Sequence, residues 1–352
     1  MCVIEIFSKG VNMKQIFVIV MAVMAALMCE AKDSTSSKVR TSGANTGVRS
    51  AKKSTTRPQM VKKTVATQPQ KANPFRKTPY VGAIAVDAQT GRVLFRDHSD
   101  ALARPASVTK LMTALLVLED VAAGKYNFNA VVTATPDVYK AEPSWVGVKP
   151  GETMTVDSLL YALMVQSAND AAIMLGVHSA GSLEGFVARM NGRAAQLGMS
   201  STRYYNPNGL PPKRKNGAKD FNVTTCEDQV KLAREILKHT RILKYTSVKV
   251  WPATYDGVRP ITGLNLAKQP EQRKFINHNN VMVKDKLKIY NPDGREAIDG
   301  LKTGYIDAGG SSVVLTGVRN GKRAIVIVLG SDTARLRDDN ARRLMIDALG
   351  AL

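Results

Sequence analysis

The sequence predicts an α+β fold in which an antiparallel sheet is flanked by helices and carries a helical insert. Strand patterns occur at both ends of the folded part, in residues 80–98 and again in residues 300–331. Helical patterns fill the chain between them. Because the two kinds of segment are separated in this way, we expect the first and last strands to pair in one sheet and the helices to form the insert.

Taken in order, the pattern in residues 80–98 turns at Gln89-Thr90-Gly91, which predicts two strands joined by a turn. Residues 103–119 carry apolar side chains at helical spacing and predict the first helix. The last strands form a hairpin with Asn320-Gly321 at its tip, a strong two-residue turn signal. Further helices are expected at residues 156–164, 170–180, 184–198 and 226–239, with a closing helix near 337–349.

Residues 1–31 are predicted to be a signal peptide. Met13, which is a candidate start, and Lys14 precede the apolar run IFVIVMAVMAALM, which has the length of a signal-peptide core and is short for a membrane span. The run leads to Cys29-Glu30-Ala31, which suits cleavage after Ala31. An uncleaved membrane anchor is the alternative, whereas the bulky Met28 argues against lipidation at Cys29. We therefore expect an exported protein of the periplasm or cell envelope.

Residues 32–77 are predicted to be a disordered basic linker. This segment holds 12 of the 50 Lys and Arg residues but one of the 29 acidic residues, although the whole chain has a formal charge of +21. It is either a solvated spacer or a contact with an anionic membrane surface or wall polymer. Aromatic side chains do not alternate with its charges, so no nucleic-acid partner is expected. Residues 78–352 are then the catalytic domain.

The three cysteines predict neither a disulfide framework nor a zinc site. Cleavage after Ala31 would remove Cys2 and Cys29 and leave Cys226, which we interpret as a buried residue at the start of a helix. The four histidines show neither metal-ligand nor catalytic-triad spacing. No metal and no cofactor are therefore expected.

Ser107 and Lys110 are the first candidate catalytic residues. They are three positions apart at the start of an apolar helix, so their side chains share a face. Apolar surroundings disfavour the charged form of a lysine, and a neutral amine can accept the proton of a serine hydroxyl. The pattern Ser-x-x-Lys is weak by itself, because it recurs at Ser50 and Lys53 in the linker; only Ser107 begins an apolar helix.

Two further polar motifs lie in apolar surroundings. Ser167 and Asn169 stand between two helical runs, where Asn169 or the next residue could simply cap the following helix. Lys302, Thr303 and Gly304 lie on a strand pattern. Since Gly304 lacks a side chain, a ligand backbone could pair with that edge, although an exposed edge lysine is the simpler interpretation.

The three motifs occur in an order that resembles the penicillin-binding proteins and serine β-lactamases. The longer phrases VKPGETMTVDSLLYALMVQSANDAA and AIDGLKTGYIDAGGS are similar to the low-molecular-mass D-alanyl-D-alanine carboxypeptidases, and so is the opening GAIAVDAQTGRVLFRDHSDALARPASVTKLMTAL. The similarity covers about residues 79–350. It implies the fold of the serine β-lactamases and DD-peptidases and a carboxypeptidase that removes the terminal D-alanine from peptidoglycan stem peptides.

The resemblance also implies roles for the catalytic residues. Ser107 would be the acylated nucleophile and Lys110 its base, whereas Ser167 and Asn169 would complete the proton network and hold the substrate amide. The backbone N–H groups of Ser107 and Tyr305 would form the oxyanion hole. β-Lactam antibiotics would acylate the same serine and leave slowly.

On the substrate side, the resemblance implies that Lys302 supports the proton network and that Thr303 binds the terminal carboxylate. Arg337 is the best match for an arginine that grips this carboxylate, with Arg335 as the neighbouring alternative. Tyr305 follows the Lys-Thr-Gly motif where many relatives have histidine, which is expected to alter substrate preference or rate.

A second departure is that the sequence stops at Leu352, so we expect neither the C-terminal β-rich domain nor the amphipathic anchor of many relatives. A peptidoglycan DD-endopeptidase that uses the same residues stays open as an alternative, as does a non-catalytic wall-binding protein. A true β-lactamase is less well supported, because no glutamate motif for rapid deacylation is evident.

Overall fold

The computed structural model describes residues 80–211, 219–253 and 273–352. The chain divides into two units, Met1–Gln68 and Pro69–Leu352; the described residues all belong to the second, which is compact. The predicted signal peptide and the basic linker lie outside the described residues. Among the described helices, no single one is long and apolar enough to cross a membrane; the bent pair Asn169–Ala180 and Leu183–Gln196 meets the criteria only when both are taken together.

The centre of the second unit is a five-stranded antiparallel sheet in the order β2-β1-β9-β8-β7. β1 pairs with β9, as in Ala83 opposite Val328, so the prediction that the two ends of the fold share one sheet is confirmed. Asn320 and Gly321 both have positive φ, at 51° and 77°, and form the predicted turn between β8 and β9. The strands are β1 (Gly82–Asp87), β2 (Val93–Asp97), β7 (Ile298–Ile306), β8 (Gly310–Arg319) and β9 (Lys322–Ser331).

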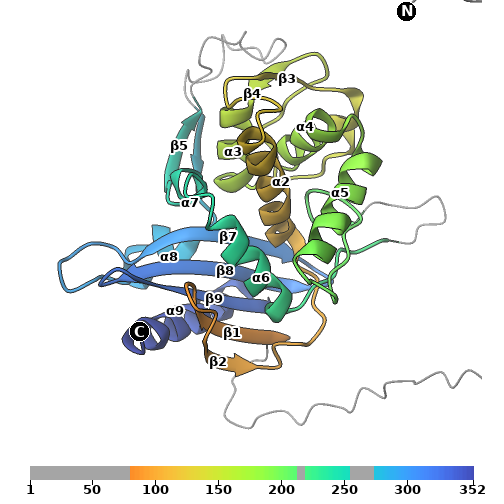
Figure 1. The fold of residues 1–352 in the computed structure, drawn as a ribbon. Coiled ribbons are helices and arrows are strands. Elements are labelled where there is room, and N and C mark those ends of the chain that lie inside the picture. Colours follow the sequence, from red (N-terminus) through yellow and green to blue (C-terminus); the bar gives the residue numbers. More distant parts are fainter. Residues whose placement is uncertain (1–79, 212–218, 254–272) are drawn as a thin grey trace, which may run out of the picture. The chain divides into compact units, whose positions relative to one another are not determined.

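Both faces of this sheet are covered by helices (Figure 1). Side chains alternate along the strands, so Ala85 and Val326 face a core that includes Met345 of α9, whereas Ile84 and Ile327 face the core beneath the helical part. The helices are α2 (Lys110–Ala122), α3 (Val156–Met164), α4 (Asn169–Ala180), α5 (Leu183–Gln196), α6 (Cys226–Ile236), α7 (Ile242–Thr246), α8 (Asn280–Val283) and α9 (Ala334–Gly350). This packing of helices on both faces of an antiparallel sheet is the predicted α+β fold.

Four of the described helices begin where a side chain caps a free backbone N–H group. Thr155, Ser182, Thr225 and Thr333 accept hydrogen bonds from the N–H three residues later, at the starts of α3, α5, α6 and α9. The caps place α9 three residues earlier than the predicted 337, and α6 ends at Ile236 instead of residue 239. Cys226 at the start of α6 is buried, as interpreted from the sequence.

Several short elements were not predicted, because three to five residues are too few to establish a period. Two small hairpins pair β3 with β4 and β5 with β6. These elements are β3 (Val131–Thr133), β4 (Thr153–Thr155), β5 (Val250–Ala253), β6 (Arg273–Ile276), α7, α8 and the 3₁₀ turns Ala106–Thr109, Pro136–Lys140 and Asp285–Leu287.

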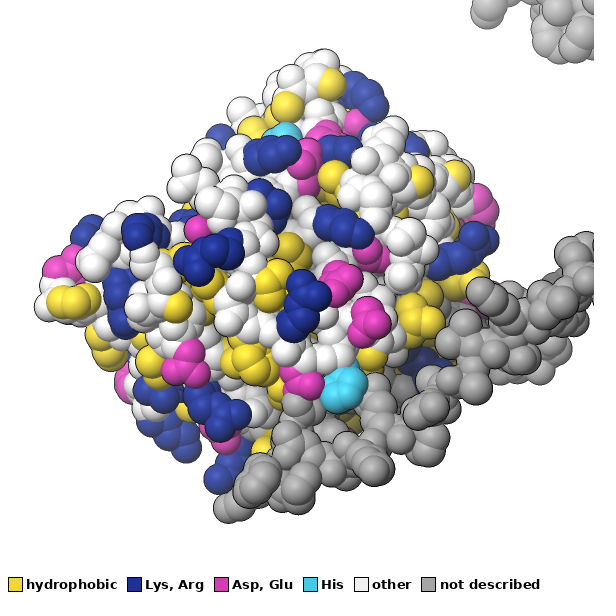
Figure 2. Space-filling model, turned by 60° about the horizontal axis from the view of Figure 1, so that its bottom comes forward, with side chains coloured by type: hydrophobic (Ala, Val, Ile, Leu, Met, Phe, Trp, Pro, Cys, Tyr) yellow, Lys and Arg dark blue, Asp and Glu magenta, His cyan; other side chains and the backbone are white. Residues whose placement is uncertain are grey.

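Positive charge is spread over the folded surface and is not confined to one patch. Figure 2 shows a face on which Lys and Arg side chains form several groups with acidic side chains between them. Many of these charges are paired; Arg193, for example, bridges Glu119 and Glu235 at 2.7 and 2.8 Å. This surface argues against a dedicated nucleic-acid groove on the face shown.

Candidate active site

Ser107 lies on the 3₁₀ turn Ala106–Thr109, directly before α2. The predicted helix therefore begins at Lys110 and not at Ser107. Two glycines from different segments of the chain, Gly304 and Gly209, lie against this turn. A Cβ at Gly304 would lie 2.5 Å from the carbonyl oxygen of Pro105 and 3.0 Å from the N–H nitrogen of Ser107, and a Cβ at Gly209 would overlap the carbonyl of Ala106. Glycine at both positions lets two backbone segments approach the turn closely.

The amine of Lys110 meets three oxygen atoms in a fully buried position. Its Nζ lies 2.8 Å from Oγ of Ser107, 2.6 Å from Oδ1 of Asn169 and 2.8 Å from the carbonyl oxygen of Asn208. A neutral amine can donate to the last two oxygens and accept the proton of the Ser107 hydroxyl with its lone pair. The sequence placed Ser107 and Lys110 on one face, and the distances agree with that prediction.

Burial lowers the pKa of Lys110 well below its ordinary value of 10.5, and the positive charge of Lys302 lowers it further. The carboxylate of Asp170 acts in the opposite direction but does not outweigh burial. The shift favours the uncharged amine, which is the state a general base requires.

Asn169 is the first residue of α4, but its side chain does not cap that helix. Its Oδ1 accepts from Lys110, and its Nδ2 donates to the carbonyl of Glu142 at 2.6 Å. The capping interpretation is thus wrong for Asn169. Ser167 is buried two residues earlier and has a positive φ of 59°, a conformation that is uncommon for a residue with a side chain.

Asp170 organises the loop that faces Asn169. Its carboxylate accepts the backbone N–H groups of Val146, Gly147 and Val148 at 2.8–3.2 Å, together with that of Ala171. An anion that receives several N–H donors is strongly held in place. Sequence reasoning considered this residue only as a helix cap; its role in holding the loop depends on contacts that are distant in the chain.

Lys302, Thr303 and Gly304 lie on β7, at one edge of the five-stranded sheet. Lys302 is 2% exposed and Thr303 is 5% exposed, so the interpretation of Lys302 as an exposed edge residue is wrong. The turn Ala106–Thr109 with Ser107, here called the nucleophile turn, packs against this strand and covers it. Nζ of Lys302 donates to the carbonyl of Thr303 at 3.0 Å. Burial, with the charge of Arg337, lowers the pKa of Lys302 to about 7.

The two candidate arginines of α9 are in different environments. Arg337 is 4% exposed, is bound to Asp338 at 2.5 Å and acts electrostatically on Lys302. The side chain of Arg335 is 89% exposed and is paired with Asp339 at 3.7 Å. The structure therefore places Arg337, and not Arg335, beside the cluster. Tyr305 at the end of the motif is 60% exposed and donates to Asp307 at 2.7 Å.

Residues 206–209 were missed by sequence reasoning. The Asn208 carbonyl binds Lys110, and Gly209, with φ of 94°, backs the nucleophile turn. Oδ1 of Asn206 accepts the N–H of Gly209 at 2.6 Å, and Asn222 donates to both Thr109 and the Asn206 carbonyl at 3.0 Å. The phrase NPNGL carries a turn signal in Asn-Gly, which could have identified the loop but not its partner.

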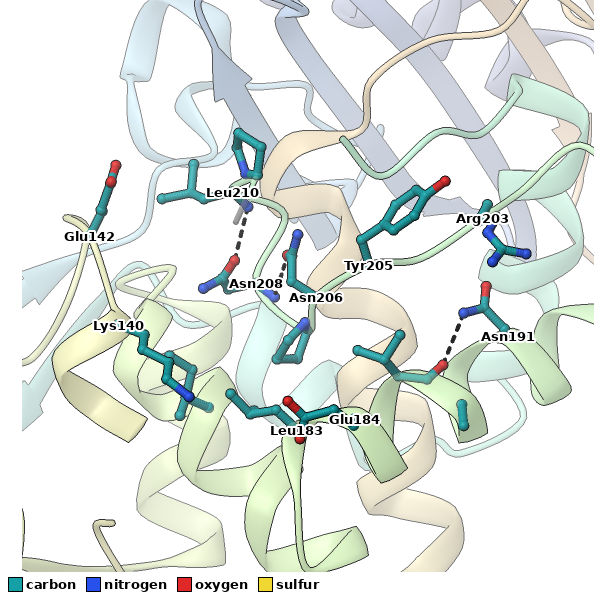
Figure 3. A pocket seen from close by; sticks show the side chains of 15 residues that line it. Lys140, Glu142, Leu183, Glu184, Asn191, Arg203, Tyr205, Asn206, Asn208 and Leu210 are labelled. Carbon is teal, nitrogen blue, oxygen red and sulfur yellow. Dashed lines mark hydrogen bonds between the residues drawn. The ribbon is translucent and has the colours of Figure 1, made fainter. Parts of the chain in front are cut away.

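A cavity of about 840 Å³ adjoins this loop (Figure 3). Asn208 and Glu142 line it, and their backbone carbonyls bind Lys110 and Asn169. The cavity and the Ser–Lys cluster thus share two segments of chain. The remaining lining residues are Lys140, Ile173, Leu183, Glu184, Val187, Ala188, Asn191, Arg203, Tyr205, Asn206, Pro207, Leu210 and Pro211.

Neither a metal site nor a cysteine nucleophile is evident in the described ranges. They contain no group of three or more His, Cys, Asp or Glu residues that could hold a metal ion. Burial raises the pKa of the Cys226 thiol, so this side chain is not activated as a thiolate.

Solved structures with the same fold are penicillin-binding proteins and DD-peptidases. Penicillin-Binding Protein D2 from Listeria monocytogenes, in its ampicillin-bound form, has 28% sequence identity and a TM-score of 0.61, with coverage of 78% of this chain and 99% of that one. The family model described as D-alanyl-D-alanine carboxypeptidase, peptidase family S11, matches residues 70–333. The chain belongs to this family, which confirms the resemblance found in the sequence.

Two curated relatives have different named activities. The D-alanyl-D-alanine carboxypeptidase DacF of Bacillus subtilis is 28% identical over 265 residues, which cover 75% of this chain and 60% of the relative. The D-alanyl-D-alanine endopeptidase of Escherichia coli K12 is 30% identical over 292 residues, which cover 80% of this chain and 82% of the relative. The chain therefore spans about three fifths of the carboxypeptidase and most of the endopeptidase.

Proposed function

We propose that this protein is an exported serine carboxypeptidase that removes the terminal D-alanine from peptidoglycan stem peptides through an acyl-enzyme on Ser107. The observation that carries the proposal is the 2.8 Å approach of Oγ of Ser107 to the fully buried amine of Lys110. Burial supplies an uncharged base beside a hydroxyl, which is the pairing that nucleophilic acyl transfer needs. Membership of the carboxypeptidase family supports the choice of substrate.

In the first step Lys110 takes the hydroxyl proton, and Oγ of Ser107 attacks the carbonyl carbon between the two D-alanines. The backbone N–H groups of Ser107 and Tyr305 stabilise the tetrahedral oxyanion. Collapse of this intermediate breaks the C–N bond, and the departing amine takes the proton from Lys110. Water then attacks the ester carbonyl, gives its proton to Lys110 and releases the shortened peptide, with the proton returning to Oγ.

The other cluster residues hold the substrate. Asn169, whose side chain already bridges Lys110 and the Glu142 carbonyl, positions the substrate amide, and Ser167 completes the proton network. Thr303 and Arg337 bind the terminal carboxylate, with Lys302 supplying positive charge beneath it. A carboxylate is the ligand chemistry that this group of cations favours. Gly304 leaves room for the peptide backbone beside β7.

Cleavage of peptide cross-links by a DD-endopeptidase is the second candidate function. The match covers 82% of the relative named as an endopeptidase, compared with 60% of the carboxypeptidase DacF. The same Ser107 mechanism would serve, because only the group attached to the departing amine changes. The proposal favours carboxypeptidase activity because the family model and most of the similar proteins carry that name.

β-Lactam antibiotics are proposed as covalent inhibitors, since one protein of the same fold, Penicillin-Binding Protein D2, is described in ampicillin- and cefotaxime-bound forms. Residues 1–31 would direct export or tether the protein to the membrane, and the basic segment 32–77 would contact a membrane surface or wall polymer. Both roles are read from composition and stay predictions.

The first test is time-resolved labelling of the full chain with a fluorescent penicillin, beside the Ser107→Ala variant. A slowly decaying label that is absent from the variant supports the acyl-enzyme. Hydrolysis assays with a linear stem peptide and with a cross-linked dimer then compare the two peptidase activities. No label on the folded parent protein would contradict the proposed mechanism and favour the non-catalytic wall-binding alternative.

A further inference from the structure

The segment that leads from β6 into α8 is tied to both elements of the proposed carboxylate site. Nδ2 of Asn279 lies 3.5 Å from the carbonyl of Gly300, two residues before Lys302 on β7. Nδ2 of Asn280 donates to Oδ2 of Asp338 at 2.8 Å, and Asp338 also holds Arg337 on α9. His278 immediately precedes these two anchors. Its backbone is therefore fixed at the junction of β7 and α9.

Cations from three elements lie within electrostatic range of His278. Lys302 of β7, Lys110 of α2 and Arg337 of α9 all act on its imidazole, and the residue is exposed to solvent. No acidic group is among the charges that act on this imidazole. The carboxylate closest along α9, that of Asp338, is already bound by Arg337 and Asn280. The positive charges of the cluster therefore favour binding of an additional anion.

We propose that His278 is a further recognition residue for the terminal carboxylate of the substrate and that acidification strengthens this contact. The inference rests on the proposed function, because that function seats a carboxylate beside Thr303 and Arg337. A neutral imidazole can donate one N–H to the carboxylate, and an imidazolium adds a full positive charge to the same contact. Sequence reasoning found no role for this histidine, since it looked for metal and triad spacing.

The direction of the pH effect follows from linkage. Partial burial, and then the charges of Lys302, Lys110 and Arg337, lower the pKa of His278 to about 4 in the free protein. A bound carboxylate offsets those charges and raises the pKa of His278, so binding takes up a proton in the interval between the two values. Affinity for the carboxylate therefore increases as the pH falls through the pKa of the bound state, and His278 adds no charge above it.

The first test compares KM and kcat of the parent and of His278→Gln from pH 5 to pH 8, with a stem peptide that has a free carboxylate. Glutamine keeps one N–H donor but cannot gain a charge. We expect the KM of the variant at pH 5.5 to be about 3- to 10-fold above that of the parent, as for a hydrogen bond that is kept but loses its charge, with convergence at pH 8. His239→Gln, in the turn after α6, is the matched control. Identical pH profiles for His278→Gln and the parent would overturn the inference.

The second test follows the ring protons of His278 by NMR in the Ser107→Ala variant, which cannot turn over substrate. An acetylated peptide ending in D-Ala-D-Ala should raise the titration midpoint of His278, and the same peptide with a C-terminal amide should not. If the carboxylate peptide binds without moving the midpoint, His278 is not a recognition residue and the proposed function stands. If the peptide does not bind and the parent takes no penicillin label, both proposals are wrong.

Discussion

The two lysines of the cluster are equally buried but are held in different ways. On the helical side, Lys110 has three oxygen partners within 2.8 Å, from Ser107, Asn169 and the Asn208 carbonyl. On the strand side, the hydrogen bond that the structure gives to Lys302 runs to the carbonyl of Thr303. We call the side of the site with Lys110 the helical wall and the side with Lys302 on β7 the strand wall. The hydrogen bonds of Lys110 suit the helical wall to the proposed proton transfer before substrate arrives. On the strand wall, the amine of Lys302 can donate further hydrogen bonds to a substrate.

The largest effect is expected on the helical wall. Lys110→Met removes the base but keeps an apolar side chain of similar length, so acylation by a fluorescent penicillin should slow by about 10³-fold or more. Stability should fall by about 1–3 kcal/mol, because the buried oxygens of Asn169 and Asn208 lose their donor. Acylation rate and thermal unfolding are measured on the same preparation. Acylation at the parent rate would show that Lys110 is not the base.

The next effect tests how closely the two walls meet. A methyl group at Gly304 would lie 2.5 Å from the Pro105 carbonyl, so Gly304→Ala should push β7 away from the nucleophile turn. A displacement of this kind can lower the acylation rate by about 10²-fold. Gly192→Ala on α5 is the matched control, because an added Cβ there meets nothing within 4 Å. Equal acylation rates for the two variants would contradict the close contact.

A smaller effect is expected from the anchor behind the helical wall. Asp170→Asn weakens the hold on three backbone N–H groups of the loop 146–148 and should lower stability by about 1–3 kcal/mol. It also removes the charge that raises the pKa of Lys110, so that pKa should fall. The acidic limb of the acylation–pH profile should consequently move to lower pH. A shift to higher pH would reverse the assigned sign.

The last effect concerns the folding stability of the strand side and not the rate of acylation. The pKa of Lys302 falls from an ordinary 10.5 to about 7 in the fold, so the unfolded chain binds more protons between these values. Lys302 therefore makes the free energy of unfolding rise with pH from about 7 to 10.5, and the contribution is lost as the pH falls. Denaturant unfolding of the parent and of Lys302→Met across this range should show a shallower rise in the variant. Parallel curves would contradict the lowered pKa.

The sequence predicted most of the sheet and the long helices, because helical periods and the turn signals between strands are local features of the chain. It also brought Ser107 and Lys110 together, since three positions on a helical turn suffice. It could not predict the carbonyl of Asn208 as a partner of Lys110, because the two residues are 98 positions apart and a carbonyl has no sequence signature. It misjudged Lys302 for a related reason. The turn that buries this edge strand comes from another part of the chain.

The fully buried position of Lys110 has a consequence for when the protein becomes reactive. In an extended chain the same amine is hydrated and carries a proton, so it cannot activate the neighbouring hydroxyl. The base exists only after α2 has been covered by α4 and by the loop 206–209. Under the proposed mechanism, tertiary folding is therefore the step that makes Ser107 reactive.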